Sequence, residues 1–98
     1  MALKLKPFDA AKYLGTEEDH ADVLADAFAS GDANYIANAL GVVARARGMT
    51  HVAREAGVTR EALYKALSPS GDPKLSTLLG VMKALGVSLS AASVHPAE

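Results

Sequence analysis

Six side chains that could bind nucleic acid lie within ten consecutive residues of this chain. They are Thr59, Arg60, Glu61, Tyr64, Lys65 and Ser68. An arginine can bond to guanine O6 and N7 together, and a glutamate can accept a hydrogen bond from cytosine N4. A tyrosine can contact a thymine methyl group or a phosphate, whereas threonine, lysine and serine are better suited to positioning a protein on the phosphate backbone. In a helix these residues would form one outward face, since residues three and four apart are neighbours.

An ordinary solvated surface is the alternative for this cluster. Glu61 and Lys65 have the spacing of an i,i+4 ion pair, and Glu61 could also orient Arg60. We favour contact with DNA because of the motif that surrounds the cluster.

That motif is a helix-turn-helix, predicted over residues 49–68. Two short helical patterns have only Gly57 and Val58 between them, so the chain must turn sharply. Thr50 and Thr59 are expected to cap the two helices, and Gly57 is expected to adopt the left-handed backbone that ends a helix. The expected inward residues are Val52, Ala53, Ala56, Val58, Leu63, Ala66 and Leu67. The second helix of such a motif enters the major groove with its amino-terminal residues toward the base edges.

An acidic stripe marks a second candidate surface. Glu18, Asp22 and Asp26 are four residues apart in a helix predicted over residues 17–29. The same helix is expected to turn Ala21, Leu24, Ala25 and Phe28 toward the core. The stripe is either a solvated face or a docking surface for a basic protein.

The other elements are also helical, so the sequence predicts an all-α fold. Asp32 is expected to cap a helix over 33–47 that Gly48 ends, with Arg45 and Arg47 as helix-end charges or phosphate contacts. Residues 68–74 read as a loop, and residues 75–85 as a helix with Leu78, Leu79, Met82 and Leu85 inward. This makes five substantial helices, or six with a short one over residues 8–14.

The 98 residues suggest one domain with an alanine-, leucine- and valine-rich core. Within it we expect an N-terminal arm and acidic helix (1–31), a helix-turn-helix core (32–89) and a tail (90–98). The net charge is −1, but residues 1–40 hold three Lys or Arg against seven Asp or Glu, and residues 41–98 hold seven against four. Such asymmetry suggests two different partners, although a short chain can acquire it by chance.

Nothing in the sequence indicates catalysis, a metal site or a cofactor. There is no cysteine, phosphate-binding glycine loop or HExxH motif, and His20, His51 and His95 lie in separate segments. No apolar run is long enough for a transmembrane helix, and the first residues do not form a secretory signal. We therefore expect a cytoplasmic protein that is not an enzyme.

The segment GVTREALYKALSPSGDPKLSTLLGVMKALGVSL, residues 57–89, resembles the phage-repressor type of helix-turn-helix domain, a compact five-helix module. More closely, it is similar to addiction-module antidote proteins, the antitoxins of type II toxin–antitoxin pairs. LKPFDAAKYLGTEED and IANALGVVARARGMTHVAREAG also fit that family's pattern, so the resemblance covers nearly the whole chain.

This resemblance implies an antitoxin that neutralises a small basic toxin of the RelE/ParE type by binding it, and that represses its own operon. Glu18, Asp22 and Asp26 are then the expected toxin contacts. Because one module reads few bases, we expect a homodimer on palindromic double-stranded DNA. Its expected dimer surface is residues 75–89, where Val87 and Leu89 lie beyond the helix, and burial of these residues in the core is the alternative. Two alternatives stay open: a stand-alone phage-type repressor, and a protein-interaction module that does not bind DNA.

Overall fold

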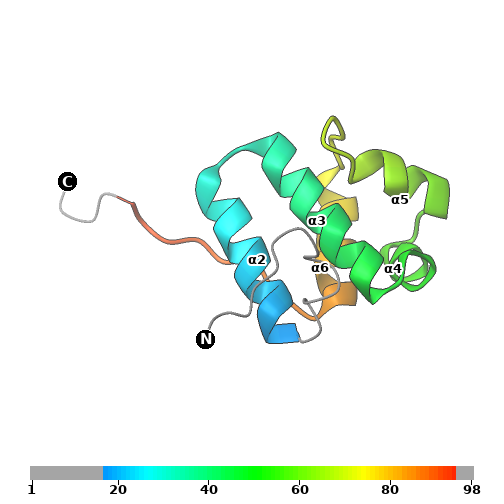
Figure 1. The fold of residues 1–98 in the computed structure, drawn as a ribbon, viewed down its shortest axis with the longest axis horizontal. Helices are drawn as coiled ribbons and strands as arrows, with labels where there is room; N and C mark the ends of the chain where they lie inside the picture. The colour runs from blue at the N-terminus through cyan, green and yellow to red at the C-terminus, as the bar shows by residue number, and fades with distance from the viewer. Residues whose placement is uncertain (1–16, 95–98) are drawn as a thin grey trace, which may run out of the picture.

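The computed structural model describes residues 17–94, with side chains from Asp19 onward. This part contains five α-helices and no strand: α2 (Glu17–Ser30), α3 (Ala33–Arg47), α4 (Met49–Ala56), α5 (Arg60–Ala66) and α6 (Leu75–Leu85) (Figure 1). The predicted all-α class is confirmed. The expected arm over 1–7, the short helix over 8–14 and the histidine at 95 lie outside the described residues.

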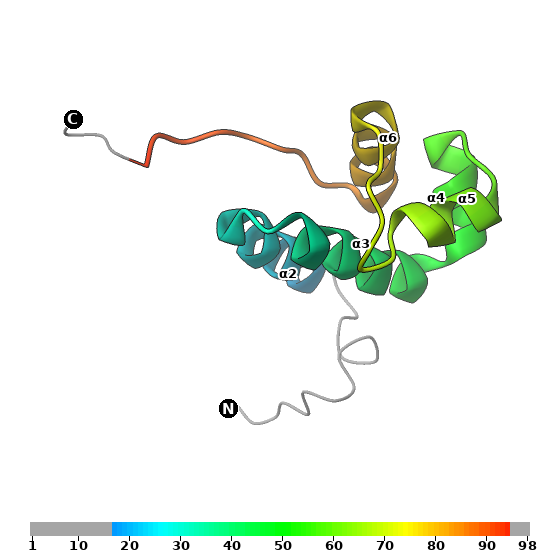
Figure 2. The ribbon, with the colours of Figure 1, turned by 90° about the horizontal axis from the view of Figure 1, so that it is seen from above.

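The helices α2 and α3 form a hairpin around a short turn. The Asp32 side chain accepts hydrogen bonds from the backbone N–H groups of Asn34 and Tyr35 at 3.0 and 3.3 Å, so the predicted cap of α3 is confirmed. The Ser30 hydroxyl donates to the carbonyl of Ala27 at 2.6 Å and closes the last turn of α2. The two helices lie side by side in both Figure 1 and Figure 2, and α4 and α5 continue from the far end of α3.

A single residue, Gly48, separates α3 from α4. Its φ of +108° belongs to a backbone conformation that other residues rarely adopt. The sequence correctly predicted that Gly48 ends α3, but the expected cap at Thr50 is wrong. Because Gly48 serves as the C-cap of α3 and the N-cap of α4 at once, α4 begins at Met49 and Thr50 already lies within it.

The core is built from leucine, valine and alanine, as the composition predicted. Leu40, Val43, Val52, Leu63 and Leu85 are all fully buried. The helix α6 packs chiefly against α4, where Gly80 permits a close approach. A Cβ atom placed on Gly80 would lie 2.9 Å from the Cα atom of Ala56.

Two positions expected to face the core are exposed instead. Ala25 on α2 and Leu79 on α6 both contact solvent, and Leu79 is 49% exposed. In their place Ala27 and Val81 are fully buried. In each helix the apolar stripe is wider than the face that contacts the core. Periodicity alone therefore could not show which apolar residues lie at the middle of that face.

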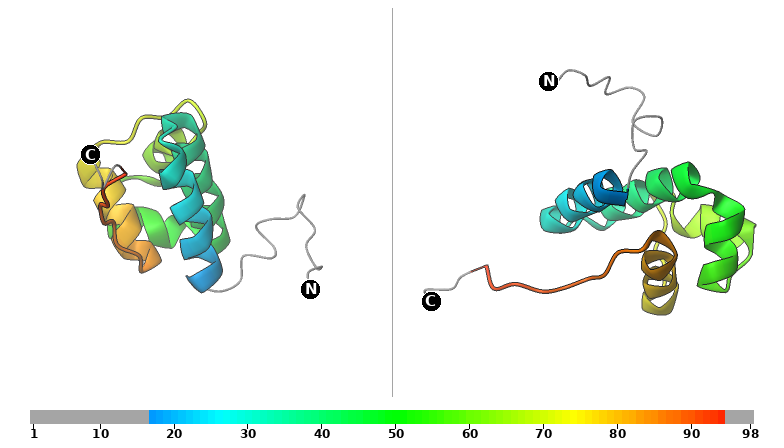
Figure 3. Two further views of the ribbon diagram at one scale, coloured as in Figure 1. Left: turned by 90° about the vertical axis from the view of Figure 1, so that its left-hand side faces the viewer. Right: turned by 90° about the horizontal axis from the view of Figure 1, so that it is seen from below.

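The segment after α6 leaves the helical body as an extended chain. From Gly86 onward it runs past α2, toward the end of the molecule opposite α5 (Figures 2 and 3). None of the helices in residues 17–94 is long and apolar enough to cross a lipid bilayer.

Candidate nucleic-acid and protein interfaces

The turn between α4 and α5 holds α5 at the surface. Gly57 has φ +75° and ψ +28°, the left-handed conformation expected at the end of α4, and its neighbour Val58 is half-buried against the core. Thr59 has an extended backbone, and its hydroxyl oxygen accepts from the N–H of Ala62 at 3.0 Å, so this predicted cap is confirmed. In Figure 1, α4 is seen nearly end-on whereas α5 is seen from the side, so the two helices point in clearly different directions.

Leu63 and Leu67 anchor α5 with 0% and 2% exposure. The opposite face of α5 is therefore free of the core. It presents the exposed candidates Thr59, Arg60, Glu61, Tyr64 and Lys65. The structure thus places five of the six predicted DNA-binding residues on one continuous exposed face.

Arg60 and Tyr64 interact one helical turn apart. The guanidinium carbon of Arg60 lies 5.6 Å from the centroid of the Tyr64 ring, within the range of a cation–π contact. Hydrogen bonding to Tyr64 raises the pKa of Arg60, and charge interactions with Tyr64 and Glu61 add to the effect. The guanidinium is consequently charged, and it rests across an aromatic ring on the outer face of α5.

Ser68 differs from the other five candidates. It follows the end of α5 and is half-buried, and its hydroxyl donates to the carbonyl of Lys65 at 3.0 Å. Its oxygen also lies 3.5 Å from the Ser70 hydroxyl at the start of the 68–74 loop. The hydroxyl therefore connects α5 to this loop.

The acidic stripe is exposed where its side chains are described. Asp22 and Asp26 both face solvent on α2. The hydroxyl of Tyr35, from α3, donates to Oδ2 of Asp26 at 2.6 Å, and this hydrogen bond raises the pKa of Tyr35. Glu18 lies in the first turn of α2, and its side chain is outside the described residues.

A polar cluster around one buried histidine, which the sequence did not predict, connects α2, α3 and α6. His20 on α2 is only 2% exposed. Arg47 of α3 extends one guanidinium nitrogen to Nδ1 of His20 at 2.9 Å and another to the carbonyl oxygen of Leu85 at 3.0 Å. Because arginine can only donate, Nδ1 of His20 must be the acceptor. Arg47 therefore has a packing role that neither sequence interpretation, helix-end charge or phosphate contact, included.

Replacing Arg47 by methionine is expected to lower the free energy of unfolding by about 2–3 kcal/mol, since a buried acceptor loses a charged donor. Urea unfolding followed by circular dichroism measures the change. Arg45→Met on the exposed face of the same helix is the control, and it should shift stability by no more than about 0.5 kcal/mol. Equal unfolding midpoints for the two variants would contradict this role of Arg47.

The candidate sites of this protein are surfaces on packed helices. In the part of the chain that the structure describes, no group of three His, Cys, Asp or Glu side chains could hold a metal ion. The geometry defines a small all-helical protein with an exposed helix face at one end and an acidic helix at the other (Figure 1).

Comparison with known proteins gives the family. The family described as "Probable addiction module antidote protein" matches residues 4–93, and the chain belongs to it. A Haemophilus influenzae protein, described only as an uncharacterized protein, is 45% identical over 87 residues, which cover 89% of this chain and 90% of the relative. No solved structure matches the chain. Membership of an antidote family implies an antitoxin role and a toxin as partner.

Proposed function

We propose that the protein is a DNA-binding antitoxin that captures a small basic toxin of the RelE/ParE type and represses its own operon. The observation that carries the DNA-binding part is the exposed face of α5. Leu63 and Leu67 fix this helix from beneath, and the tight turn at Gly57 holds its first turn outward. A helix presented in this way has the form of the recognition helix of a helix-turn-helix.

Each exposed side chain then has a role that fits its chemistry. Arg60 lies in the first turn and bonds to guanine, while Glu61 accepts from cytosine N4. Tyr64 supports the Arg60 guanidinium and contacts a thymine methyl group or a phosphate. Thr59 and Lys65 contact phosphates, and the Thr59 hydroxyl can do so because its cap uses only the oxygen as acceptor. The hydroxyl of Ser68 positions the end of α5 from within the molecule.

The protein acts on DNA as a homodimer in this proposal. Two copies of α5 about 34 Å apart would read the two halves of a palindrome. Leu75 and Leu79 support α6 as the dimer face, since they lie one turn apart and are 66% and 49% exposed. Val87 is half-buried against the core, which makes it less suitable for this face than the sequence suggested.

Toxin capture is proposed for the acidic helix α2. Asp22 and Asp26 are exposed there, and the helix sequence contains no lysine or arginine. An acidic surface attracts a basic partner over distance and speeds their association. The acidic helix and α5 lie at opposite ends of the molecule in Figures 1 and 2, which supports simultaneous binding of toxin and DNA.

Retardation of the protein's own promoter fragment in a native gel tests the DNA-binding function. We expect a retarded band whose intensity falls as salt rises, because phosphate contacts release counterions. Co-expression with the neighbouring reading frame tests the antitoxin function, and we expect it to restore growth that this frame alone inhibits.

The net charge of −1 favours one second candidate, a protein-interaction module without DNA binding. Restored growth with no retardation at any salt concentration would establish that candidate. Retardation without any effect on growth would instead indicate a stand-alone repressor.

A further inference from the structure

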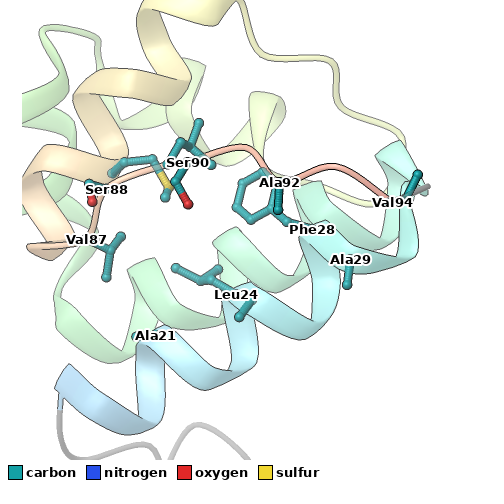
Figure 4. Close-up of a pocket in the computed structure, with 12 residues that line it drawn as sticks. Ala21, Leu24, Phe28, Ala29, Val87, Ser88, Ser90, Ala92 and Val94 are labelled. Atoms are coloured by element: carbon teal, nitrogen blue, oxygen red, sulfur yellow. The ribbon is translucent and has the colours of Figure 1, made fainter. Parts of the chain in front are cut away.

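An apolar groove of about 540 Å³ lies between α2 and the extended segment that follows α6 (Figure 4). Leu24 and Phe28 line it from α2, and Met82 lines it from α6. Ser90, Ala92 and Val94 line the opposite side. The groove is therefore open between a helix and an extended segment.

The helical wall explains why an alanine predicted to lie in the core is exposed. Ala25 and Ala29 both line the groove and both face solvent. These two small side chains leave room for another chain to approach the backbone of α2 closely. Beneath them Leu24 belongs to the core and gives the groove an apolar floor.

The opposite wall is an extended segment without secondary structure, residues 88–94. All seven residues are exposed, and Ser88, Leu89, Ser90, Ala92 and Val94 line the groove. Among the described residues, no backbone–backbone hydrogen bond involves this segment. Its N–H and C=O groups can therefore pair with an added strand.

The charges beside the groove all have one sign. Asp22 and Asp26 precede Ala25 and Ala29 by three residues, so they form the adjacent ridge of α2. The helix α2 has no lysine or arginine, and residues 84–94 carry no charge at all. An occupant with apolar side chains and a positive charge would match this site.

We infer that this groove receives an extended basic segment of the toxin, which pairs along residues 88–94 and inserts apolar side chains toward Leu24 and Phe28. The inference rests on the proposed antitoxin function and gives its docking site. The acidic ridge attracts the toxin, and the groove holds it.

Arg47 connects the two walls of the groove. It bonds to His20 on α2 and to the carbonyl of Leu85, the last residue of α6 before the extended segment turns away at Gly86. Arg47 therefore links the two walls through one side chain that reaches both of them.

Filling the groove tests the inference. Ala25→Trp and Ala29→Trp place a large ring on exposed positions of α2, and Ala46→Trp on exposed α3 is the matched control. The probe is the purified polypeptide encoded by the neighbouring reading frame, with binding followed by interferometry. We expect both groove variants to weaken its binding by about tenfold or more, and the control to bind like the wild type. Melting temperature and retardation of the promoter fragment should not change.

A second variant tests the backbone pairing alone. Prolines at both Ala91 and Ala92 remove two neighbouring N–H groups, which point to opposite edges of an extended chain, and they keep the segment extended. We expect this variant, which leaves the core untouched, also to bind the polypeptide more weakly.

Failure of the groove and failure of the antitoxin function give different results. Normal binding by the wild type and by all groove variants overturns the groove alone, whereas no binding by the wild type overturns the antitoxin function as well. If the groove variants lose their dimer in sedimentation while their affinity for the polypeptide is unchanged, the groove binds a second copy of this chain. That result would overturn the inference. Faster proteolysis of the N-terminal arm in the groove variants, with unchanged affinity for the polypeptide, would also overturn the inference. It would indicate that the arm occupies the groove.

Discussion

Replacing Arg60 by alanine is expected to weaken specific binding of the promoter fragment by about 1–3 kcal/mol, or between about 5-fold and 150-fold. Arg60 is exposed in the first turn of α5 and rests against the Tyr64 ring, so its guanidinium is held where it can reach a base edge. The loss should be confined to the cognate sequence, because a bidentate contact to guanine carries sequence information. Fluorescence anisotropy with cognate and scrambled duplexes at one salt concentration measures both affinities.

Lys83→Ala on the exposed face of α6 is the control for this experiment, since it removes one positive charge away from α5. Arg60→Lys adds a sharper comparison. Lysine keeps the charge but lacks the planar fork, so it should not restore specificity. Unchanged affinity of Arg60→Ala for the cognate duplex would remove this residue from the recognition surface. An equal loss on both duplexes would make Arg60 a phosphate contact.

Reversing the three acidic residues of α2 to lysine is expected to slow toxin capture by about 100-fold at low salt, which is the range that electrostatic steering spans. The variant carries Glu18→Lys, Asp22→Lys and Asp26→Lys. Asp22 and Asp26 are exposed, and α2 has no lysine or arginine that already compensates them. Stopped-flow mixing with the labelled product of the neighbouring reading frame measures the association rate constant. The difference in association rate constant between the variant and the wild type should become smaller as the salt concentration rises.

Two controls separate charge from structure in that experiment. Tyr35→Phe removes the hydrogen bond to Asp26 and leaves the charge, so its capture rate should match the wild type. Asp72→Lys changes one exposed charge in the loop before α6, and it should also have little effect. Retardation of the promoter fragment should persist in the triple variant. A capture rate independent of these three charges would exclude the acidic stripe as the docking surface.

The arrangement of the two surfaces bears on how an antitoxin could do both tasks. The exposed face of α5 and the acidic helix α2 are at opposite ends of the molecule (Figures 1 and 2). The helix α3 connects these ends, because its start forms a hairpin with α2 and its end leads through Gly48 into α4. In the proposed function, this separation allows toxin and DNA to bind at different ends of the molecule.

Local sequence signals were sufficient for most of the secondary structure. Asp32, Thr59, Gly48, Gly57 and Gly86 mark helix ends through side-chain capping or glycine conformations that depend on nearby residues only. The same local logic placed the outward residues of α5, because Leu63 and Leu67 leave only one face for solvent. These features could be predicted because they need no knowledge of what packs against each helix.

Only the tertiary structure decided what depends on contacts between distant segments. The separation of 27 residues between His20 and Arg47 hides their buried pair from any local pattern. Ala25 lines a groove that exists only because residues 88–94 run beside α2, and the close contact at Gly80 follows from the packing of α4 against α6. Helical periodicity determines which residues share a face. The neighbour that covers or leaves open that face is determined by how the whole chain packs.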